Sequence, residues 1–265
     1  MKEISSRDNP LYKELKQLAT SSQARRKAQR TLLDGVHLCE AYLQLAGAPL
    51  MCVASASACS LAEAAAILAQ CESRRVSCIV LPDALYHALS QVEQGVGILF
   101  VISTPQTAAP AQLTQSAVLL DRLQDPGNLG SILRSAAAAG IRQVYCSPGT
   151  VFAWSPKVLR AGMGAHFLLE IVENADLAAL LQGATVPVLA TSSHAAQTVY
   201  DRDLSQPVAW LFGHEGQGVA EELLAQATHQ VGIPHLGAVE SLNVAASAAV
   251  CFFEQVRQTI RARGA

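Results

Sequence analysis

The sequence lacks the features that define several large classes of protein. Charged residues make up only 15% and aromatic residues only 5% of its 265 positions, whereas apolar residues make up 51%. A chain of this composition can bury a substantial core, which excludes global disorder. No apolar run approaches the roughly 20 residues that cross a bilayer, and no apolar signal segment follows Met1. We therefore expect a cytoplasmic protein with no membrane partner.

The cysteine pattern does not favour metal or disulfide chemistry. There are seven cysteines, and no two of them have the C-x-x-C spacing. An odd number without paired spacing predicts neither a zinc site nor a disulfide framework. Five of the seven lie between Cys39 and Cys78 among Ala, Val and Leu, which indicates small buried apolar side chains.

Charge is distributed unevenly along the chain. Residues 1–30 carry eight Lys and Arg against three Asp and Glu, although the whole chain has a net charge of −2. A basic N-terminal face on an otherwise acidic protein is typical of a chain with a polyanionic partner. An ordinary solvated helix surface is the alternative, and charge alone leaves both open.

Composition divides the chain into two parts. The stretch Ser103–Gln115 is rich in Pro, Thr and Gln and has no apolar period, so we interpret it as a linker. We place a first domain at residues 1–105, a linker at 106–115 and a second domain at 116–265.

Short apolar runs alternate with helical patterns in both parts, which predicts two α/β domains. The first is a small α/β sandwich, interrupted by a polar, basic break at Ser21–Arg30. The second has a mostly parallel sheet with helices on both faces. Its candidate strands are Ala117–Leu120, Gln143–Cys146, Phe167–Ile171, Val186–Ala190, Val208–Phe212 and Gln230–Ile233.

Three loops that follow candidate strands are unusual, and ligands bind at such loops in open α/β sheets. The first carries the turn sequence Asp-Pro-Gly-Asn at 125–128, and the second has three glycines within 213–218. The third precedes a long Ala-rich helix, for which Ser241 is a natural N-cap. Each loop alone also fits a plain strand-to-helix connection. The dinucleotide and phosphate-loop glycine signatures are absent.

Together, the three loops resemble the motifs of the SpoU (TrmH-type) family of S-adenosylmethionine-dependent RNA ribose methyltransferases. The matching patterns are Asn128-x-Gly130-x-x-x-Arg134, Gly213-x-Glu215-x-x-Gly218 and Ile233-Pro234-x-x-Gly237-x-x-x-Ser241-Leu242-Asn243. The resemblance covers residues 116–262. Ser155–His166 resembles an intermediate segment of the family, with Gly162 where the family often has Ser. The first 105 residues resemble an L30e-like substrate-binding domain.

This resemblance implies an α/β trefoil-knot domain, a homodimer with active sites near the subunit interface, and S-adenosyl-L-methionine as cofactor. The catalytic residues that it implies are Arg134, Asn128, Glu215, Ser241 and Asn243. The implied cofactor-binding residues are Thr191, Leu211, Gly213, Glu215, Gly218, Ile233, Leu242 and Asn243. The RNA-binding residues that we expect are Lys13, Arg25, Arg26, Lys27, Arg30, Lys157 and Arg160.

The implied reaction is methylation of a ribose 2′-hydroxyl of RNA, and the ribosomal-protein-like first domain favours rRNA over tRNA. The resemblance credits Arg134 with activating the hydroxyl. Because a guanidinium is normally always charged, Arg134 either has its protonation shifted by nearby charges or orients the substrate and stabilises the developing alkoxide. A tRNA methyltransferase, a non-catalytic RNA-binding or ribosome-assembly protein, and a small-molecule enzyme binding another nucleotide are the alternatives.

Overall fold

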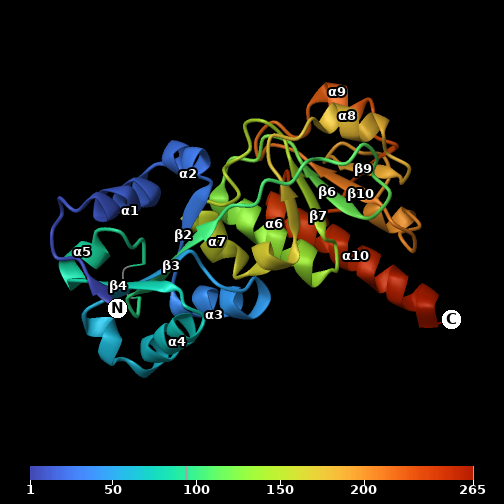
Figure 1. Cartoon of the computed structure of the whole chain (residues 1–265). Coiled ribbons are helices and arrows are strands. Elements are labelled where there is room, and N and C mark those ends of the chain that lie inside the picture. The colour runs from blue at the N-terminus through green and yellow to red at the C-terminus, as the bar shows by residue number, and fades with distance from the viewer. Residues whose placement is uncertain (93–94, 265) are drawn as a thin grey trace. The chain divides into compact units, whose positions relative to one another are not determined.

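The computed structural model describes residues 1–92 and 95–264, which form two compact units (Figure 1). The first unit comprises Met1–Pro105 and Trp154–Phe167, and the second comprises Gln106–Ala153 and the chain from Leu168 onward. The sequence-based division had assigned Trp154–Phe167 to the second domain. In the structure, Thr31 Oγ1 donates a hydrogen bond to the backbone oxygen of Trp154 at 2.7 Å, which ties this segment to the first unit.

The first unit is built on a five-stranded mixed sheet. Its order is β1 (Lys2–Glu3), β4 (Ser77–Leu81), β3 (Met51–Ser55), β5 (Ile98–Ser103) and β2 (Arg30–Asp34). Strand β5 runs antiparallel to both of its neighbours, and the other pairs are parallel. The helices of this unit are α1 (Pro10–Thr20), α2 (Ser22–Ala28), α3 (Val36–Leu45), α4 (Ala62–Ser73), α5 (Asp83–His87) and α7 (Pro156–Gly162).

Helix α2 corrects the expectation of a polar break at Ser21–Arg30. The Ser21 side chain accepts a hydrogen bond from the backbone N–H of Ala24 and so caps the helix. Gln29 ends the helix in the left-handed conformation, at φ 51°. The polar composition had concealed a short helix whose ends are fixed by local capping.

The second unit contains a six-stranded sheet in which every pair of neighbours is parallel. Its order is β11 (His229–Val231), β9 (Val188–Thr191), β10 (Ala209–Phe212), β6 (Ala117–Leu120), β7 (Gln143–Cys146) and β8 (Glu170–Val172). The prediction of an α/β protein with a mostly parallel sheet is confirmed. The expected strand Phe167–Ile171 is partly wrong, because the short helix η2 (Ala165–Leu168) occupies its first half.

Side chains alternate along β10 between the two faces of the second sheet, and each face packs against its own layer of helices. Ala209 and Leu211 face a cluster that includes residues of α8 (Leu177–Gln182) and the end of α9 (Glu221–Leu224). Trp210 and Phe212 belong to an aromatic cluster with Phe252 of α10 (Val244–Gly264). Figure 1 shows α8 and α9 on one side of the sheet and α6 (Pro126–Ala138) with α10 on the other.

Strand order places a ligand crevice in this sheet. From β6 the chain builds outward through β7 and β8, then crosses to build β9, β10 and β11 on the other side. Because the connections diverge on either side of β6 and β10, a crevice opens at the carboxyl ends of these strands. The loops that begin at Asp121 and Gly213 meet there. No helix in the described part of the chain combines the length and apolarity that crossing a membrane requires.

Candidate active site

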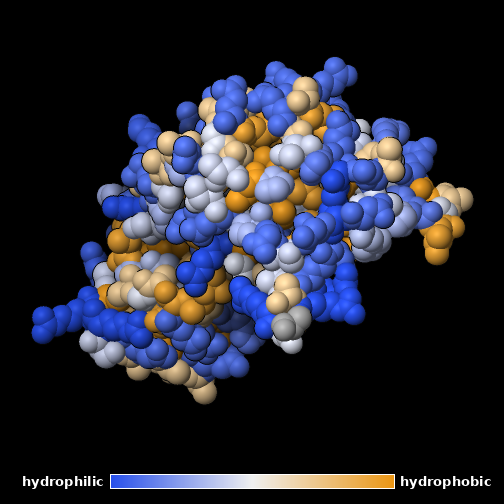
Figure 2. Space-filling model, turned by 90° about the vertical axis from the view of Figure 1, so that its right-hand side faces the viewer, coloured by the Kyte–Doolittle hydropathy of each residue, from blue (hydrophilic) through white to orange (hydrophobic). Residues whose placement is uncertain are grey.

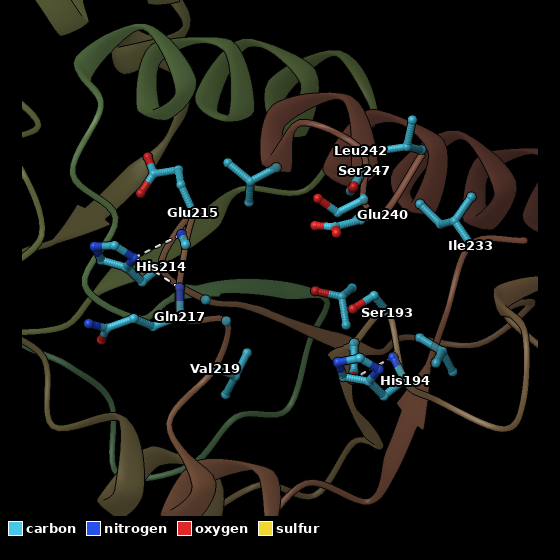
Figure 3. Close-up of a pocket in the computed structure, with 18 of the residues that line it drawn as sticks. Ser193, His194, His214, Glu215, Gln217, Val219, Ile233, Glu240, Leu242 and Ser247 are labelled. Carbon is cyan, nitrogen blue, oxygen red and sulfur yellow. Dashed lines mark hydrogen bonds between the residues drawn. The ribbon is translucent and has the colours of Figure 1, made fainter. Parts of the chain in front are cut away.

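The loop after β10 folds back on itself. The backbone N–H of His214 donates to the oxygen of Gly218 at 3.0 Å, and the N–H of Gly218 donates to the oxygen of His214 at 2.8 Å. His214 Nδ1 also accepts from the N–H groups of Gly216 and Gln217 (Figure 3). A Cβ at position 213 would lie 2.0 Å from the carbonyl carbon of Gly218, so only glycine fits at Gly213.

Glu215 is held by a set of donors from the end of β6. Its carboxylate accepts hydrogen bonds from the backbone N–H groups of Gln124 at 3.1 Å and Asp125 at 2.9 Å, and from Asn128 Nδ2 at 3.2 Å. Partial burial acts to raise the pKa of Glu215, but these hydrogen bonds outweigh it, so the pKa lies below its ordinary value. Glu215 is therefore an anion that fastens the glycine loop to the start of α6.

A hydrogen-bond relay joins the three motifs. Asn128 Nδ2 donates to Glu215, and Asn128 Oδ1 accepts from Asn243 Nδ2 at 2.9 Å. This assignment of the amide nitrogen and oxygen is the one in which both contacts are favourable, because the carboxylate can only accept. Residues from the first turn of α6 and from the loops after β10 and β11 therefore form one continuous hydrogen-bonded chain, which we call the Glu215–Asn128–Asn243 relay.

The helix cap that we predicted at Ser241 is instead formed by Asn243. Asn243 Oδ1 accepts from the N–H groups of Ala245 at 2.9 Å and Ala246 at 3.3 Å, at the start of α10. Ser241 is exposed in the preceding loop and lines the pocket described below. The side chain that caps the last helix is thus the same one that completes the relay.

Sequence reasoning missed Asp121, a buried carboxylate directly after β6. It accepts hydrogen bonds from the backbone N–H of Ala220 at 3.0 Å, from Ser147 Oγ at 3.3 Å and from Arg122 Nε at 3.2 Å. Asp121 therefore ties together the ends of β6, β7 and the glycine loop. The available signal was an acidic residue at the carboxyl end of a fully apolar strand.

A cavity of about 800 Å³ lies against the glycine loop. Six of the eight predicted cofactor residues line it: Thr191, Gly213, Glu215, Gly218, Ile233 and Leu242. Figure 3 shows Ile233 and Leu242 on one side of the cavity and His214, Glu215 and Gln217 on the other. Ser192, Ser193 and His194 also line it and were missed. They follow β9, the neighbour of β10, so the strand-end rule could have found them.

Four other predicted catalytic or cofactor-binding residues do not line the cavity: Leu211, Asn128, Asn243 and Arg134. Leu211 is buried in β10, although its carbonyl accepts a hydrogen bond from Thr191 Oγ1 at 3.3 Å. Asn128 and Asn243 belong to the relay instead. Arg134 is exposed on α6 and has no hydrogen bond or ion pair with any residue that the structure describes. It lies six positions after Asn128, which places the two side chains on different faces of the helix.

The predicted RNA-binding cations differ in their surroundings. Lys13 and Arg30 form exposed ion pairs with Asp8 and Glu14, and Lys27 is exposed. Lys157 and Arg160 lie on α7, where Lys157 is exposed and Arg160 is half-buried. The last turn of α2 contains Arg25, Arg26 and Lys27, and Arg26 is exposed.

Arg25 requires a correction. Its side chain is 7% exposed, and Nη1 donates to the backbone oxygen of Leu18 at 2.6 Å and of Ala19 at 3.4 Å. Burial, and secondarily the positive charge of Arg26, lower the pKa of Arg25. The guanidinium satisfies carbonyls at the end of α1, so its role is structural rather than the predicted phosphate contact.

The fold and the cavity define an α/β protein with a site of cofactor size between a glycine loop and the loop that leads into an Asn-capped helix. The chain belongs to the SpoU rRNA Methylase family, whose model matches residues 115–253. It is 36% identical over 263 residues to an uncharacterised tRNA/rRNA methyltransferase of Synechocystis, covering 96% of this chain and 93% of that protein.

Two further relatives extend this similarity over nearly the whole chain. The 23S rRNA (guanosine(2553)-2′-O)-methyltransferase RlmP of Bacillus subtilis is 29% identical over 262 residues, covering 96% of this chain and 98% of that protein. The solved structure of the SpoU methyltransferase AviRb of Streptomyces viridochromogenes in complex with AdoMet has a TM-score of 0.86 and 25% identity, covering 95% of this chain and 98% of that one. The knotted α/β fold expected of the family is therefore shared by this chain.

Proposed function

We propose that this protein transfers a methyl group from S-adenosyl-L-methionine to a ribose 2′-hydroxyl of ribosomal RNA. The observation that carries the proposal is the Glu215–Asn128–Asn243 relay, which brings three separate sequence motifs together beside one cavity. The names of the relatives, which include an rRNA 2′-O-methyltransferase and an AdoMet complex, support it.

The lining of the cavity fits this cofactor. Its volume of about 800 Å³ is in the range of small-molecule sites. Ile233 and Leu242 offer apolar surface to an adenine ring, and the glycine loop offers backbone atoms to polar groups. No Lys or Arg is among the lining residues of the described chain, which suits a nucleoside without phosphates.

The bound cofactor supplies an electrophilic methyl group on a sulfonium. The ribose oxygen gains a bond to the methyl carbon as the carbon–sulfur bond breaks, its electron pair stays with sulfur, and the hydroxyl proton passes to solvent. The protein must therefore align the hydroxyl and stabilise charge on oxygen. We assign this role to Arg134, because a charged guanidinium is a poor base but a good partner for a developing alkoxide.

We also propose that the protein acts as a homodimer through its second unit. Arg134 does not line the cavity of its own chain, and in this proposal the second subunit brings its Arg134 to that cavity. Exposed apolar side chains are available for an interface, among them Leu236, Val239, Phe253 and Ile260. Figure 2 shows patches of apolar surface on the side toward which the end of α10 points in Figure 1.

A mixing experiment tests this arrangement. Arg134→Ala lacks the catalytic side chain, and Gly213→Val blocks the cofactor loop, so each homodimer is expected to be inactive. If the active site is shared, co-expressed mixed dimers regain part of the wild-type activity. Sedimentation shows the mass of the assembly, and a monomer, or mixtures that stay inactive, would contradict the shared site.

The exposed cations of the first unit supply the phosphate contacts in this proposal. Lys13, Arg26, Lys27, Arg30 and Lys157 are the residues that we assign to RNA, and such contacts position RNA without reading its sequence. Both exposed ion pairs, at Lys13 and Arg30, are weak enough to be exchanged for phosphate. We propose a cytoplasmic location, where rRNA is the substrate.

The test of the activity is label transfer from methyl-labelled S-adenosylmethionine to rRNA and tRNA that carry no modifications. Label on a 2′-oxygen of rRNA, lost with Arg134→Ala but kept with the exposed control Arg142→Ala, is the expected result. Label on tRNA alone would favour the tRNA alternative. Cofactor binding without transfer to RNA or to ribosomal particles would favour a non-catalytic RNA-binding protein.

A further inference from the structure

Carboxylates dominate the charge of the cavity lining. Two carboxylates, Glu215 and Glu240, line it, and the described lining residues include no Lys or Arg. Three histidines, His194, His214 and His235, also line the cavity, and His214 Nδ1 faces inward to its own loop, where it accepts two backbone N–H groups. An anionic cavity favours a cationic ligand over a neutral one of the same shape.

The two carboxylates are not equivalent. Glu215 is engaged by three donors that fix the glycine loop. Glu240 makes no hydrogen bond or ion pair with any residue in the described parts of the chain. Figure 3 shows its side chain beside Leu242 and Ser247, with the carboxylate directed into the cavity. Glu240 is therefore the carboxylate that is available to a ligand.

We propose that Glu240 makes the cavity selective for the positively charged methyl donor over its neutral thioether product. This inference rests on the proposed function. Transfer of the methyl group leaves an uncharged sulfur, so the attraction of Glu240 for that atom is lost as the reaction completes. The donor is thereby favoured in binding and the product is favoured in release.

The expected size of the effect follows from Coulomb's law. Glu240 is exposed, so an effective dielectric constant of about 40–80 applies, and a separation of about 6 Å then corresponds to roughly a three- to tenfold preference. Because the site is open to solvent, salt screens the interaction. The preference for the donor is therefore expected to shrink as ionic strength rises.

Calorimetric titration of the full-length protein tests the proposal. The probes are S-adenosylmethionine, its neutral product S-adenosylhomocysteine, and sinefungin, which carries an ammonium group in place of the sulfonium. Glu240→Gln keeps the size of the side chain and removes its charge. We expect it to weaken binding of the two cationic ligands by about three- to tenfold and to leave the neutral product unchanged. Glu222→Gln, on the exposed surface of α9, is the matched control and leaves all three unchanged.

Two results would overturn the inference while leaving the proposed function intact. Equal weakening of all three ligands would mean that Glu240 binds a group common to donor and product, such as the α-ammonium. Unchanged affinities in Glu240→Gln would mean that its charge is irrelevant to binding. If the wild-type protein bound none of the three ligands, the proposed function would fail together with the inference.

Discussion

Replacing Asn128 by Asp tests the relay, because it exchanges the side-chain NH2 group for an oxygen and leaves the size of the side chain almost unchanged. Asn128 Nδ2 lies 3.2 Å from a carboxylate oxygen of Glu215. Asp at this position removes the donor and places a second negative charge there. The bond from Asn243 to the other oxygen of residue 128 is retained, so the perturbation is confined to one contact.

The magnitude follows from that distance. Two unit charges 3.2 Å apart repel by about 1–3 kcal/mol at effective dielectric constants of about 80–40. Loss of a hydrogen bond to a charged group adds about 1 kcal/mol at a solvent-exposed site. Asn128→Asp is therefore expected to weaken cofactor binding by about 2–4 kcal/mol, or about 30- to 700-fold. Asn128→Ala, which only loses hydrogen bonds, is expected to cost about 1–2 kcal/mol.

The pH dependence of cofactor affinity distinguishes repulsion between the two carboxylates from loss of the hydrogen bond to Glu215. Two adjacent carboxylates raise the pKa of one of them, so lowering the pH to 5 protonates part of the pair and restores a hydrogen bond. Cofactor affinity measured by calorimetry between pH 5 and 8 should recover at low pH for Asn128→Asp but not for Asn128→Ala. Asn9→Asp is the charge control, because either residue caps α1. A defect in Asn128→Asp that is independent of pH, or smaller than that of Asn128→Ala, would refute the relay.

Three further predictions concern neighbouring features. Gly213→Ala should abolish cofactor binding because its Cβ would lie 2.0 Å from loop backbone, whereas Gly216→Ala, whose nearest contact is a flexible ring at 3.8 Å, should bind normally in the same titration. The pKa of Glu215 is lowered from its ordinary value of about 4.5, so its ionised form stabilises the loop fully at every pH above that ordinary value. This stabilisation is lost only as the pH falls through the lowered pKa. Wild-type binding should thus be constant from pH 8 to about pH 5, and a decline that begins near pH 6 would contradict this. Arg25→Ala should lower the free energy of unfolding by about 1–3 kcal/mol, as measured by urea denaturation, whereas Lys27→Ala should change it by less than about 0.5 kcal/mol and reduce only RNA affinity in a filter-binding assay.

The regular elements were largely predictable because their signals are local. Ala117–Leu120 and Gln143–Cys146 are continuous apolar runs, and they form β6 and β7 with the predicted bounds. Pro156–Gly162 forms α7, and the Pro at its first position is a local helix-start signal. Its assignment to the first unit was not predictable, because that depends on packing between segments about 120 positions apart.

The site was predictable as a set of loops but not as a set of contacts. Ser241 and Asn243 are both good N-cap residues, and the sequence alone does not decide between them. Asn243 is also held by Asn128, 115 positions away, and such a long-range contact leaves no local pattern. Arg25 illustrates the same limit, because its neighbours Arg26 and Lys27 are exposed while its own guanidinium binds two carbonyls.

The separation of Asn128 and Asn243 has a consequence for how the protein is made. A ribosome builds the chain from its N-terminus, so the first unit and all six strands of the second sheet are synthesised before residues 233–243, the segment that closes the cavity. The glycine loop is present by residue 219, but it lacks its apolar wall until Ile233 and Leu242 emerge. If the first unit binds RNA as we propose, a nascent chain that ends before Asn243 has its RNA-binding surface before its cofactor cavity is complete, and translation itself delays the moment at which the protein becomes an enzyme.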